Sequence, residues 1–236
     1  MTKIYAFIPA RSGSERVVNK NLRLLGNKPL LQHTLDLINH IPQIEKTFIS
    51  TDYKNIHENI NLNESVYIVN RPSEIAQSTS LDIDWILHLI DYIADDLPDL
   101  IILLRPTSPF RTADFVNIAI SNLINNPGFD SSRSIHLVKE HPDKMWRKHE
   151  DSIIPYNSFN LDEKEDLHSQ QYKSLDEVFI QTSSLEILRT TSVIKNKKLS
   201  GKKILPIYSD YMNAFSIDYE IDYKIAEMIM NKTLII

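Results

Sequence analysis

The sequence predicts an α/β protein, a Rossmann-like three-layer α/β/α sandwich with a mostly parallel sheet. Short apolar runs, which are typical of buried strands, alternate with segments whose apolar residues recur every 3.6 positions, as on one face of a helix. This alternation favours parallel strands joined by right-handed helical crossovers. With 236 residues, of which 42% are hydrophobic and 24% charged, the chain can bury one sizeable core. We therefore expect a single domain over residues 1–236.

The predicted strands and helices follow one another in a regular order. The runs that predict strands are residues 4–8, 47–50, 66–69, 100–104 and 134–138, and a further strand-like run covers 177–187. The predicted helical faces consist of Leu30, Leu31, Thr34, Leu35 and Ile38, then Trp85, Ile86, Leu89, Ile90 and Ile93, then Phe115, Ile118, Ala119 and Leu123, and finally Ile221, Ile225, Met228 and Ile229.

A polar segment at about residues 141–176 departs from this pattern. It has no clear hydrophobic period, and long irregular segments inside compact domains are usually functional. The segment is consistent with a surface insertion, a lid, or an arm that pairs with another subunit.

Composition excludes several classes of function. The chain has no cysteine, so disulfides, thiolate nucleophiles and zinc–thiolate or iron–sulfur sites are excluded. A net charge of −5 argues against a large non-specific nucleic-acid surface. No run approaches the ~20 apolar residues of a membrane span or has the pattern of a signal peptide. We therefore expect a cytoplasmic protein with no nucleic-acid or membrane partner.

The segment directly after the first predicted strand combines small and basic residues. It reads IPARSGSER over residues 8–16, and Lys20 and Asn21 follow. Ligands of open α/β sheets bind beyond the carboxyl ends of the strands, where loop N–H groups and basic side chains suit phosphates. The segment is neither a P-loop nor a G-x-G-x-x-G motif. A solvated basic turn is the alternative interpretation.

Several segments resemble one enzyme family in the same order. They are IPARSGSERVVNKNL at residues 8–22, STD at 50–52, RPSEIA at 71–76, LLRPTSPFR at 103–111, HPDK at 141–144, VFIQTSSLEI at 178–187 and SIDYEIDYKIAE at 216–227. Together they resemble the cytidylyltransferases that activate sialic acid and related nonulosonic acids, whose opening signature is close to IPARGGSKGIPGKNL. The segments at 103–111 and 178–187 are most similar to members that act on bacterial legionaminic-type acids.

The resemblance implies a reaction of CTP with a nonulosonic acid that gives a CMP-sugar and pyrophosphate. Another sugar nucleotidyltransferase, acting on 3-deoxy-manno-octulosonate (Kdo) or a different sugar, and a non-catalytic paralogue that binds sugar or nucleotide remain alternatives. Because family members are usually dimers, we expect a homodimer in which the segment at about 141–176 is an inserted dimerisation arm that reaches the neighbour.

The resemblance also implies which residues bind the nucleotide. In the family, the opening-loop arginine and lysine hold the CTP phosphates, so Arg11 and Lys20 are the expected catalytic residues. The expected nucleotide-binding residues are Ala10, Arg11, Ser14, Lys20, Asn21, Arg71 and Ser80, with backbone groups at 76–80 facing the cytosine. The family has lysine where this chain has Glu15, so we expect Glu15 to point away from the phosphates and Arg16 to compensate.

For the sugar acid, the resemblance implies binding by Arg105, Thr107, Ser108, Lys144 and Phe179. Arg105 stands where many sialic-acid members have glutamine, and Lys144 matches a lysine near the sugar carboxylate. Without the resemblance, the LLRPTSPFR segment is a proline-punctuated turn that ends a strand.

The expected cofactor is Mg²⁺, because the family has an Asp-x-Asp motif near its C-terminus. Here Ser216 replaces the first aspartate and Asp218 keeps the second position, so Asp218 is the expected metal ligand. Mg²⁺ accepts one or two carboxylates together with substrate phosphates and waters. Asp222 is expected to cap the last helix instead.

Overall fold

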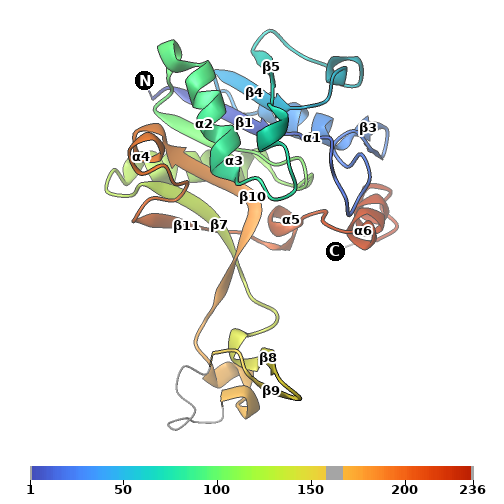
Figure 1. Ribbon diagram of the computed structural model, residues 1–236, viewed down its shortest axis with the longest axis vertical. Coiled ribbons are helices and arrows are strands. Elements are labelled where there is room, and N and C mark those ends of the chain that lie inside the picture. The colour runs from blue at the N-terminus through green and yellow to red at the C-terminus, as the bar shows by residue number, and fades with distance from the viewer. Residues whose placement is uncertain (1, 158–166, 235–236) are drawn as a thin grey trace.

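A computed structural model describes residues 2–157 and 167–234, and its body is a seven-stranded sheet covered by helices (Figure 1). The strand order is β11-β7-β10-β6-β1-β4-β5. These strands are β1 (Ile4–Pro9), β4 (Lys46–Thr51), β5 (Val66–Asn70), β6 (Leu100–Leu103), β7 (Ser131–Leu137), β10 (Phe179–Arg189) and β11 (Ile204–Tyr208). The helices are α1 (Leu30–Ile38), α2 (Asp82–Tyr92), α3 (Ala113–Asn125), α4 (Thr190–Asn196), α5 (Tyr211–Ala214) and α6 (Glu220–Met230).

Strand direction confirms the prediction of a mostly parallel sheet. β1 pairs in parallel with β4 and β6, β4 with β5, and β7 with β11. Within the seven-stranded sheet of the described chain, β10 alone runs antiparallel to its neighbours, β6 and β7. The reason lies in the connection, because the chain leaves the body along β7, passes through the 141–176 segment and returns along β10 (Figure 1).

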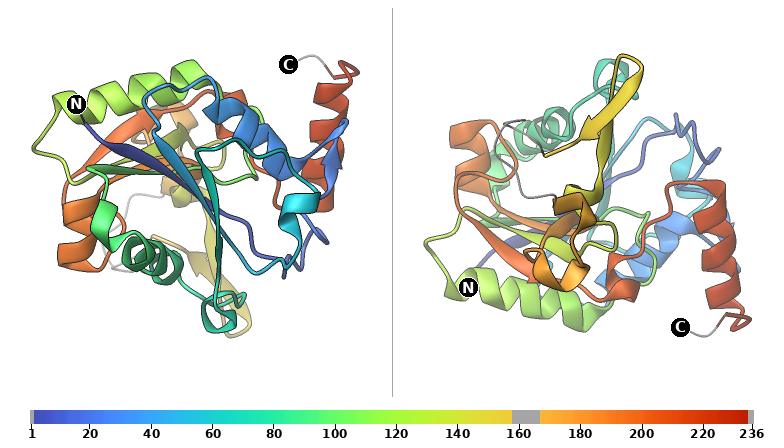
Figure 2. Two further views of the ribbon diagram at one scale, coloured as in Figure 1. Left: turned by 90° about the horizontal axis from the view of Figure 1, so that it is seen from above. Right: turned by 90° about the horizontal axis from the view of Figure 1, so that it is seen from below.

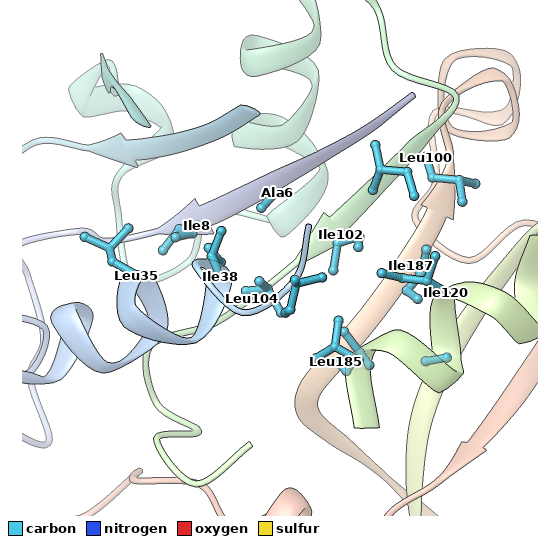
Figure 3. Close-up of a cluster of buried hydrophobic side chains, with 14 of the residues drawn as sticks. Ala6, Ile8, Leu35, Ile38, Leu100, Ile102, Leu104, Ile120, Leu185 and Ile187 are labelled. Atoms are coloured by element: carbon cyan, nitrogen blue, oxygen red, sulfur yellow. The ribbon is translucent and has the colours of Figure 1, made fainter. Parts of the chain in front are cut away.

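The alternation of buried side chains along β1 explains the three layers. Ile4, Ala6 and Ile8 face α1 and α3 on one side of the sheet, whereas Tyr5 and Phe7 face α2 and α4 on the other. Successive strand residues point to opposite faces, so a strand that is apolar at every position is buried on both sides. Figure 2 shows helices on both sides of the sheet, and Figure 3 shows the cluster under α1 and α3.

The segment predicted as an arm projects from the body on the extended ends of β7 and β10 (Figure 1). Contrary to the irregular structure that its sequence suggests, it contains an antiparallel hairpin of β8 (Trp146–His149) and β9 (Ser152–Pro155), with short 3₁₀ turns at Pro142–Lys144, Leu167–Ser169 and Tyr172–Ser174. Residues 158–166 of the predicted arm lie outside the described residues. The arm exposes several large apolar side chains, namely Met145, Trp146, Ile153, Tyr156 and Tyr172.

The C-terminal helix α6 packs beside the first loop rather than on the main sheet (Figure 2). Tyr223 and Ala226 of α6 form a small core with Val17, Leu25 and Leu30, next to the pair of β2 (Leu24–Leu25) and β3 (Lys28–Pro29). This packing brings the turn before α6 close to residues 10–21. Within the described ranges, no helix combines the length and apolarity needed to cross a membrane.

Candidate active site

A cleft of about 490 Å³ lies beyond the carboxyl ends of the parallel strands, where residues after β1, β5 and β6 line it. Pro9 ends β1, Arg71 follows β5 and Arg105 follows β6. This is the edge of an open α/β sheet at which ligands bind. Asp218, from the turn before α6, closes the cleft on the side of the first loop.

Hydrogen bonds that involve the loop's backbone groups and the Ser12 side chain fix the course of the loop. The Ser12 N–H and Oγ each donate to the Asp52 carboxylate at 2.6 Å, and Thr51 Oγ1 donates to the Ala10 carbonyl at 2.6 Å. Asn21 Nδ2 donates to the Arg11 carbonyl at 3.0 Å. The Arg11 guanidinium itself forms no hydrogen bond or ion pair with any described residue. A free cation therefore faces the cleft on a fixed loop.

Lys20 joins the first loop to the turn before α6. Its Nζ donates to the Ile217 carbonyl at 2.9 Å and lies 3.8 Å from Asp218 Oδ1. Burial lowers the pKa of Lys20, the nearby Asp218 carboxylate opposes this shift, and the positive charges of Arg11 and Arg16 add to it. Like charges that crowd one cleft lose this repulsion when an anion binds. Lys20, Arg11 and Arg16 together therefore suit a polyanion such as a triphosphate.

Arg71 is buried in the wall of the cleft, with only 4% of the residue exposed. Its Nε donates to Ser50 Oγ and its Nη2 to the Ser50 carbonyl, both at 3.0 Å, and its guanidinium lies 5.2 Å from the centre of the Trp85 ring. Burial lowers the pKa of Arg71 to about 10. Gln77, Ser78 and Ser80 line the cleft beside it. This flat, partly aromatic wall with polar neighbours suits a nucleobase.

A second cleft, also of about 490 Å³, adjoins the first and shares Asp82, Arg105 and Asp218 with it. Arg105 forms ion pairs at 2.6 Å with Asp82 and with Glu186 of β10. Burial alone would lower the pKa of Arg105, but the two carboxylates outweigh it and raise that pKa. Glu186 also pairs with Arg133 of β7. The charges on the floor of this cleft thus compensate one another.

The Asp218 carboxylate, which lines both clefts, fits a metal ion that is held mainly by the phosphates of a bound nucleotide. The Asp218 side chain is 50% exposed, and Ser216 Oγ lies 3.1 Å from Ser183 Oγ. Across residues 2–157 and 167–234, no cluster of three or more His, Cys, Asp or Glu side chains could hold a metal by itself. One carboxylate beside a triphosphate site is a donor set that Mg²⁺ accepts. Asp218 is therefore the residue that would contact it.

Asp222 caps α6, as the sequence predicts. Its Oδ2 accepts the Asp218 N–H at 2.9 Å and the Tyr219 N–H at 2.8 Å. Asp222 consequently satisfies backbone donors at the start of the helix, and it fixes the backbone that carries Asp218.

The structure brings most of the predicted site residues together and separates a few. Those that line the first cleft are Arg11, Ser14, Lys20, Asn21, Arg71, Ser80, Arg105, Thr107 and Asp218. Ala10 and Ser108 are buried behind it, and the backbone groups of Ala10 bond to Ser50 and Thr51. Glu15 and Arg16 both line the cleft, and the orientation of the Glu15 carboxylate relative to bound phosphates stays a prediction.

Lys144 lies in the arm and Phe179 lies at the start of β10, and neither residue lines either cleft. Lys144 Nζ donates to the carbonyls of His168 at 3.0 Å and Gln170 at 2.6 Å, and it lies 5.0 Å from the Tyr172 ring centre. It forms no ion pair with a described carboxylate. Phe179 packs against Tyr208 with ring centres 5.3 Å apart.

Sequence reasoning missed Asp82 and Glu186, which hold Arg105 between the clefts. Glu186 had a usable signal, because it interrupts an otherwise apolar run and charged residues are rarely buried without a partner. Asp82 had none, since an acid in the first turn of a helix is ordinary.

The chain is similar to known proteins over nearly its whole length. The chain is 29% identical over 233 residues to the CMP-N,N'-diacetyllegionaminic acid synthase of Legionella pneumophila subsp. pneumophila (strain Philadelphia 1), covering 97% of this chain and 96% of the relative. It is 27% identical over 235 residues to the N-acylneuraminate cytidylyltransferase of Escherichia coli O18:K1:H7 (strain RS218), covering 98% of this chain and 53% of that relative, so the chain spans about half of the latter's length.

A solved structure of a CMP:2-keto-3-deoxy-manno-octonic acid synthetase complexed with CTP has the same fold. The TM-score is 0.69 at 12% identity, covering 99% of this chain and 100% of that one. The family model described as Cytidylyltransferase matches residues 5–152, which is more than half of the chain. These residues carry the first loop, the Arg71 wall and the Arg105 segment, and on this evidence the chain belongs to the cytidylyltransferase family and is a nucleotidyltransferase.

Proposed function

We propose that this cytidylyltransferase couples CTP to a nonulosonic acid and releases pyrophosphate. The observation that carries the proposal is the pair of adjoining clefts that share Asp82, Arg105 and Asp218. The first cleft offers cations and a flat wall, which suit a nucleoside triphosphate, and the second is polar, which suits a sugar acceptor. The name of the Legionella relative, aligned over nearly the whole chain, supports a nonulosonic acid as that acceptor.

The proposed chemistry is an in-line substitution at phosphorus. The anomeric hydroxyl of the sugar acid attacks the α-phosphorus of CTP, the bond from that phosphorus to the α,β-bridging oxygen breaks, and pyrophosphate leaves with the bonding electron pair. The hydroxyl proton passes to solvent, directly or through the sugar's own carboxylate. Arg11 and Lys20 offset the charge that develops on pyrophosphate, and the clefts align the two reactants. Mg²⁺ bound at Asp218 would neutralise phosphate charge and orient the triphosphate.

We further propose that the active unit is a homodimer in which the arm of one subunit reaches the neighbour's second cleft. Arg105 is already paired with two carboxylates, so it is a poor partner for the sugar carboxylate. Among the described residues, Lys144 is held only by carbonyls and an aromatic ring, so no described carboxylate competes with an external anion for it. Arm exchange would bring Lys144 and Phe179 to the sugar.

The test measures pyrophosphate release with CTP, UTP or GTP against a panel of nonulosonic acids and Kdo, at several Mg²⁺ concentrations. We expect CTP to be preferred and a nonulosonic acid to be turned over. Preference for Kdo would replace the acceptor in the proposal, and preference for UTP or GTP would contradict the nucleotide assignment. No release with any of the acids would overturn the proposed reaction.

A further inference from the structure

The two adjoining clefts have similar volumes but opposite charge. The first is lined by three carboxylates and by five cationic side chains, which are Arg11, Arg16, Lys20, Arg71 and Arg105. The second is also lined by three carboxylates, but Arg105 is the only lysine or arginine of the described chain that lines it. A site that suits a polyphosphate therefore lies directly beside a cleft whose charge opposes one.

Glu186 is the carboxylate that distinguishes the second cleft from the first. Asp82 and Asp218 line both clefts, whereas Glu186 lines the second alone. Its side chain is only 6% exposed, and a buried carboxylate needs partners for its charge. Its Oε1 lies 2.6 Å from Arg105 Nη1, and its Oε2 pairs with Arg133 Nη2. One carboxylate thus holds two arginines at the floor of the cleft.

The register of the sheet places these charged groups on one face. Glu186 of β10 lies opposite Arg133 of β7 and opposite Leu103 of β6. Leu103 packs in the cluster under α2, Arg105 follows it by two residues, and Asp82 is the first residue of α2. Side chains directly opposite one another on neighbouring strands share a face. The four charged side chains therefore converge on the α2 side of the sheet, where their ion pairs form.

Without the charge of Glu186, the floor of the second cleft would attract phosphates. A guanidinium presents N–H donors in a planar fork that matches phosphate oxygens. Arg105 and Arg133 contact the same carboxylate, so a neutral residue in its place would leave two such forks with one carboxylate fewer to oppose them. The triphosphate of CTP and the released pyrophosphate would then compete for the cleft. A sugar acid brings a single carboxylate, for which the proposed contact with Lys144 of the partner subunit suffices.

We infer that Glu186 keeps polyphosphates out of the second cleft and so reserves that cleft for the sugar acid. The inference rests on the proposed function and goes beyond it, because it assigns the separation of the two substrates to one residue. The Glu186 carboxylate occupies donors of Arg105 and Arg133 that would otherwise bind phosphate oxygens, and its charge repels those oxygens. A polyphosphate brings several negative charges, so this repulsion acts on it more strongly than on a monocarboxylate.

The test compares wild type with Glu186→Gln, which keeps the shape of the side chain and an oxygen acceptor but removes the charge. The double variant Glu186→Gln/Arg133→Met also removes a cation and so restores the charge balance of the floor. The matched control is Glu45→Gln, the same change at an exposed position before β4, at the amino end of the parallel strands. Thermal unfolding verifies that each variant is folded. Asp82→Asn removes the other carboxylate partner of Arg105, at a side chain that is 43% exposed, and replaces Glu186→Gln if that variant does not fold.

The probe is inorganic tripolyphosphate, which carries the charge of a triphosphate without the nucleoside, at a fixed free Mg²⁺ concentration. In calorimetric titrations, we expect one site per chain in wild type, in Glu45→Gln and in the double variant, and two sites in Glu186→Gln. The second measurement follows formation of the CMP-sugar with CTP saturating the first cleft. There, tripolyphosphate should compete with the sugar acid in Glu186→Gln, with an inhibition constant about tenfold lower than in wild type, the usual effect of one charge-assisted hydrogen bond.

Other results would overturn the inference. A single site and unaltered inhibition in Glu186→Gln would show that the charge excludes nothing, and two sites in wild type would show that the second cleft already accepts polyphosphates. A double variant that keeps the second site would show that charge balance is not the cause. A wild-type enzyme that forms no CMP-sugar with any nonulosonic acid would overturn the proposed function, whereas the number of tripolyphosphate sites would still decide what Glu186 does.

Discussion

At the scale of single residues, charge placement distinguishes the roles of the cations in the first cleft. Arg71 is buried and bonded to Ser50, so it shapes the wall. Lys20 is held by Ile217 and Asp218, so it links the first loop to the turn before α6. Arg11 is fixed through its backbone while its guanidinium stays free of described partners. Arg11 is therefore the cation best placed to stabilise negative charge that develops on a bound phosphate.

Replacing Arg11 should affect turnover far more than stability. We expect Arg11→Ala to lower the rate of pyrophosphate release by about two to three orders of magnitude, the usual effect of losing one charge-assisted donor to a developing charge. The free energy of unfolding should change by less than about 0.5 kcal/mol, because the guanidinium forms no hydrogen bond or ion pair with a described residue. The control is Lys195→Ala on α4, which removes a positive charge beyond the carboxyl end of the antiparallel strand β10. Wild-type release by Arg11→Ala would exclude the residue from the mechanism.

The metal requirement should depend on Asp218. Asp222, and not Asp218, accepts the backbone N–H groups at the start of α6. Loss of a helix cap would therefore not explain an effect of Asp218→Asn. Asp218→Asn removes the carboxylate and should nearly abolish Mg²⁺-dependent release. Ser216→Asp restores a second carboxylate two residues away and should lower the Mg²⁺ concentration that gives half activity. Titrating Mg²⁺ against turnover for the three proteins decides the matter, and an Asp218→Asn curve that overlays wild type would contradict the assignment.

Among individual residues, the sequence predicted the cleft best where a motif follows a strand. Arg11, Arg71 and Arg105 each follow a strand of the parallel sheet, so topology alone gathers them. The cleft residues on β10, such as Gln181 and Glu186, could not be placed in this way. Their position depends on β10 running antiparallel to β6, and the hydrophobic period of a segment does not predict the direction of its strand.

At the scale of elements, the predicted strands at 4–8, 47–50, 66–69 and 100–104 agree closely with the structure, whereas the bounds of the strands on the other side of the sheet differ more or were missed. Residues 4–8 and 100–104 correspond closely to β1 and β6. β7 begins earlier than predicted, at Ser131, because Ser131 and Ser132 are buried although they are polar. β11 was missed, and Pro206 in its middle explains why, since proline is tolerated on an edge strand but weakens the strand pattern.

The α6 cap offers a prediction at this scale. Asp222→Ala leaves the Asp218 and Tyr219 N–H groups without their acceptor, which should cost about 1 kcal/mol. For a chain of this length the melting temperature should fall by about 2–4 °C. The matched control is Asp114→Ala in the first turn of α3, where Thr112 provides the cap. A drop in melting temperature no larger than that of the control would show that the cap contributes nothing.

At the scale of the whole molecule, the arm is the feature that a single subunit does not explain. It projects from the body on two extended strands (Figure 1). It exposes large apolar side chains, and its Lys144 lines neither cleft. Its polar sequence did not reveal the β8–β9 hairpin, because a short hairpin with exposed faces has no buried face to create a period. Exposed apolar groups on a projecting element suit a contact with a second copy.

We therefore expect a homodimer at micromolar concentration, held partly by the arm. Ile153→Glu, at a side chain on β9 whose residue is 62% exposed, should shift sedimentation toward monomer because it places a charge in an apolar contact. Ile118→Glu on α3 makes the same change at a residue that is 61% exposed, and it should leave the dimer intact. A wild-type protein that sediments as a monomer would contradict the arrangement.

Subunit mixing tests whether the arm completes the neighbour's site. Arg11→Ala disables the cleft of its own chain, and Lys144→Ala removes the cation that its own arm would deliver to the partner. In a mixed dimer, the chain with Arg11 intact receives the arm of the chain with Lys144 intact, so one complete site forms. Mixing the two inactive variants should thus restore about a quarter of wild-type release, because half of randomly mixed dimers are heterodimers and each has one intact site. If each arm served its own chain's cleft instead, every site in the mixture would lack one of the two residues, and release would stay at the level of the separate variants.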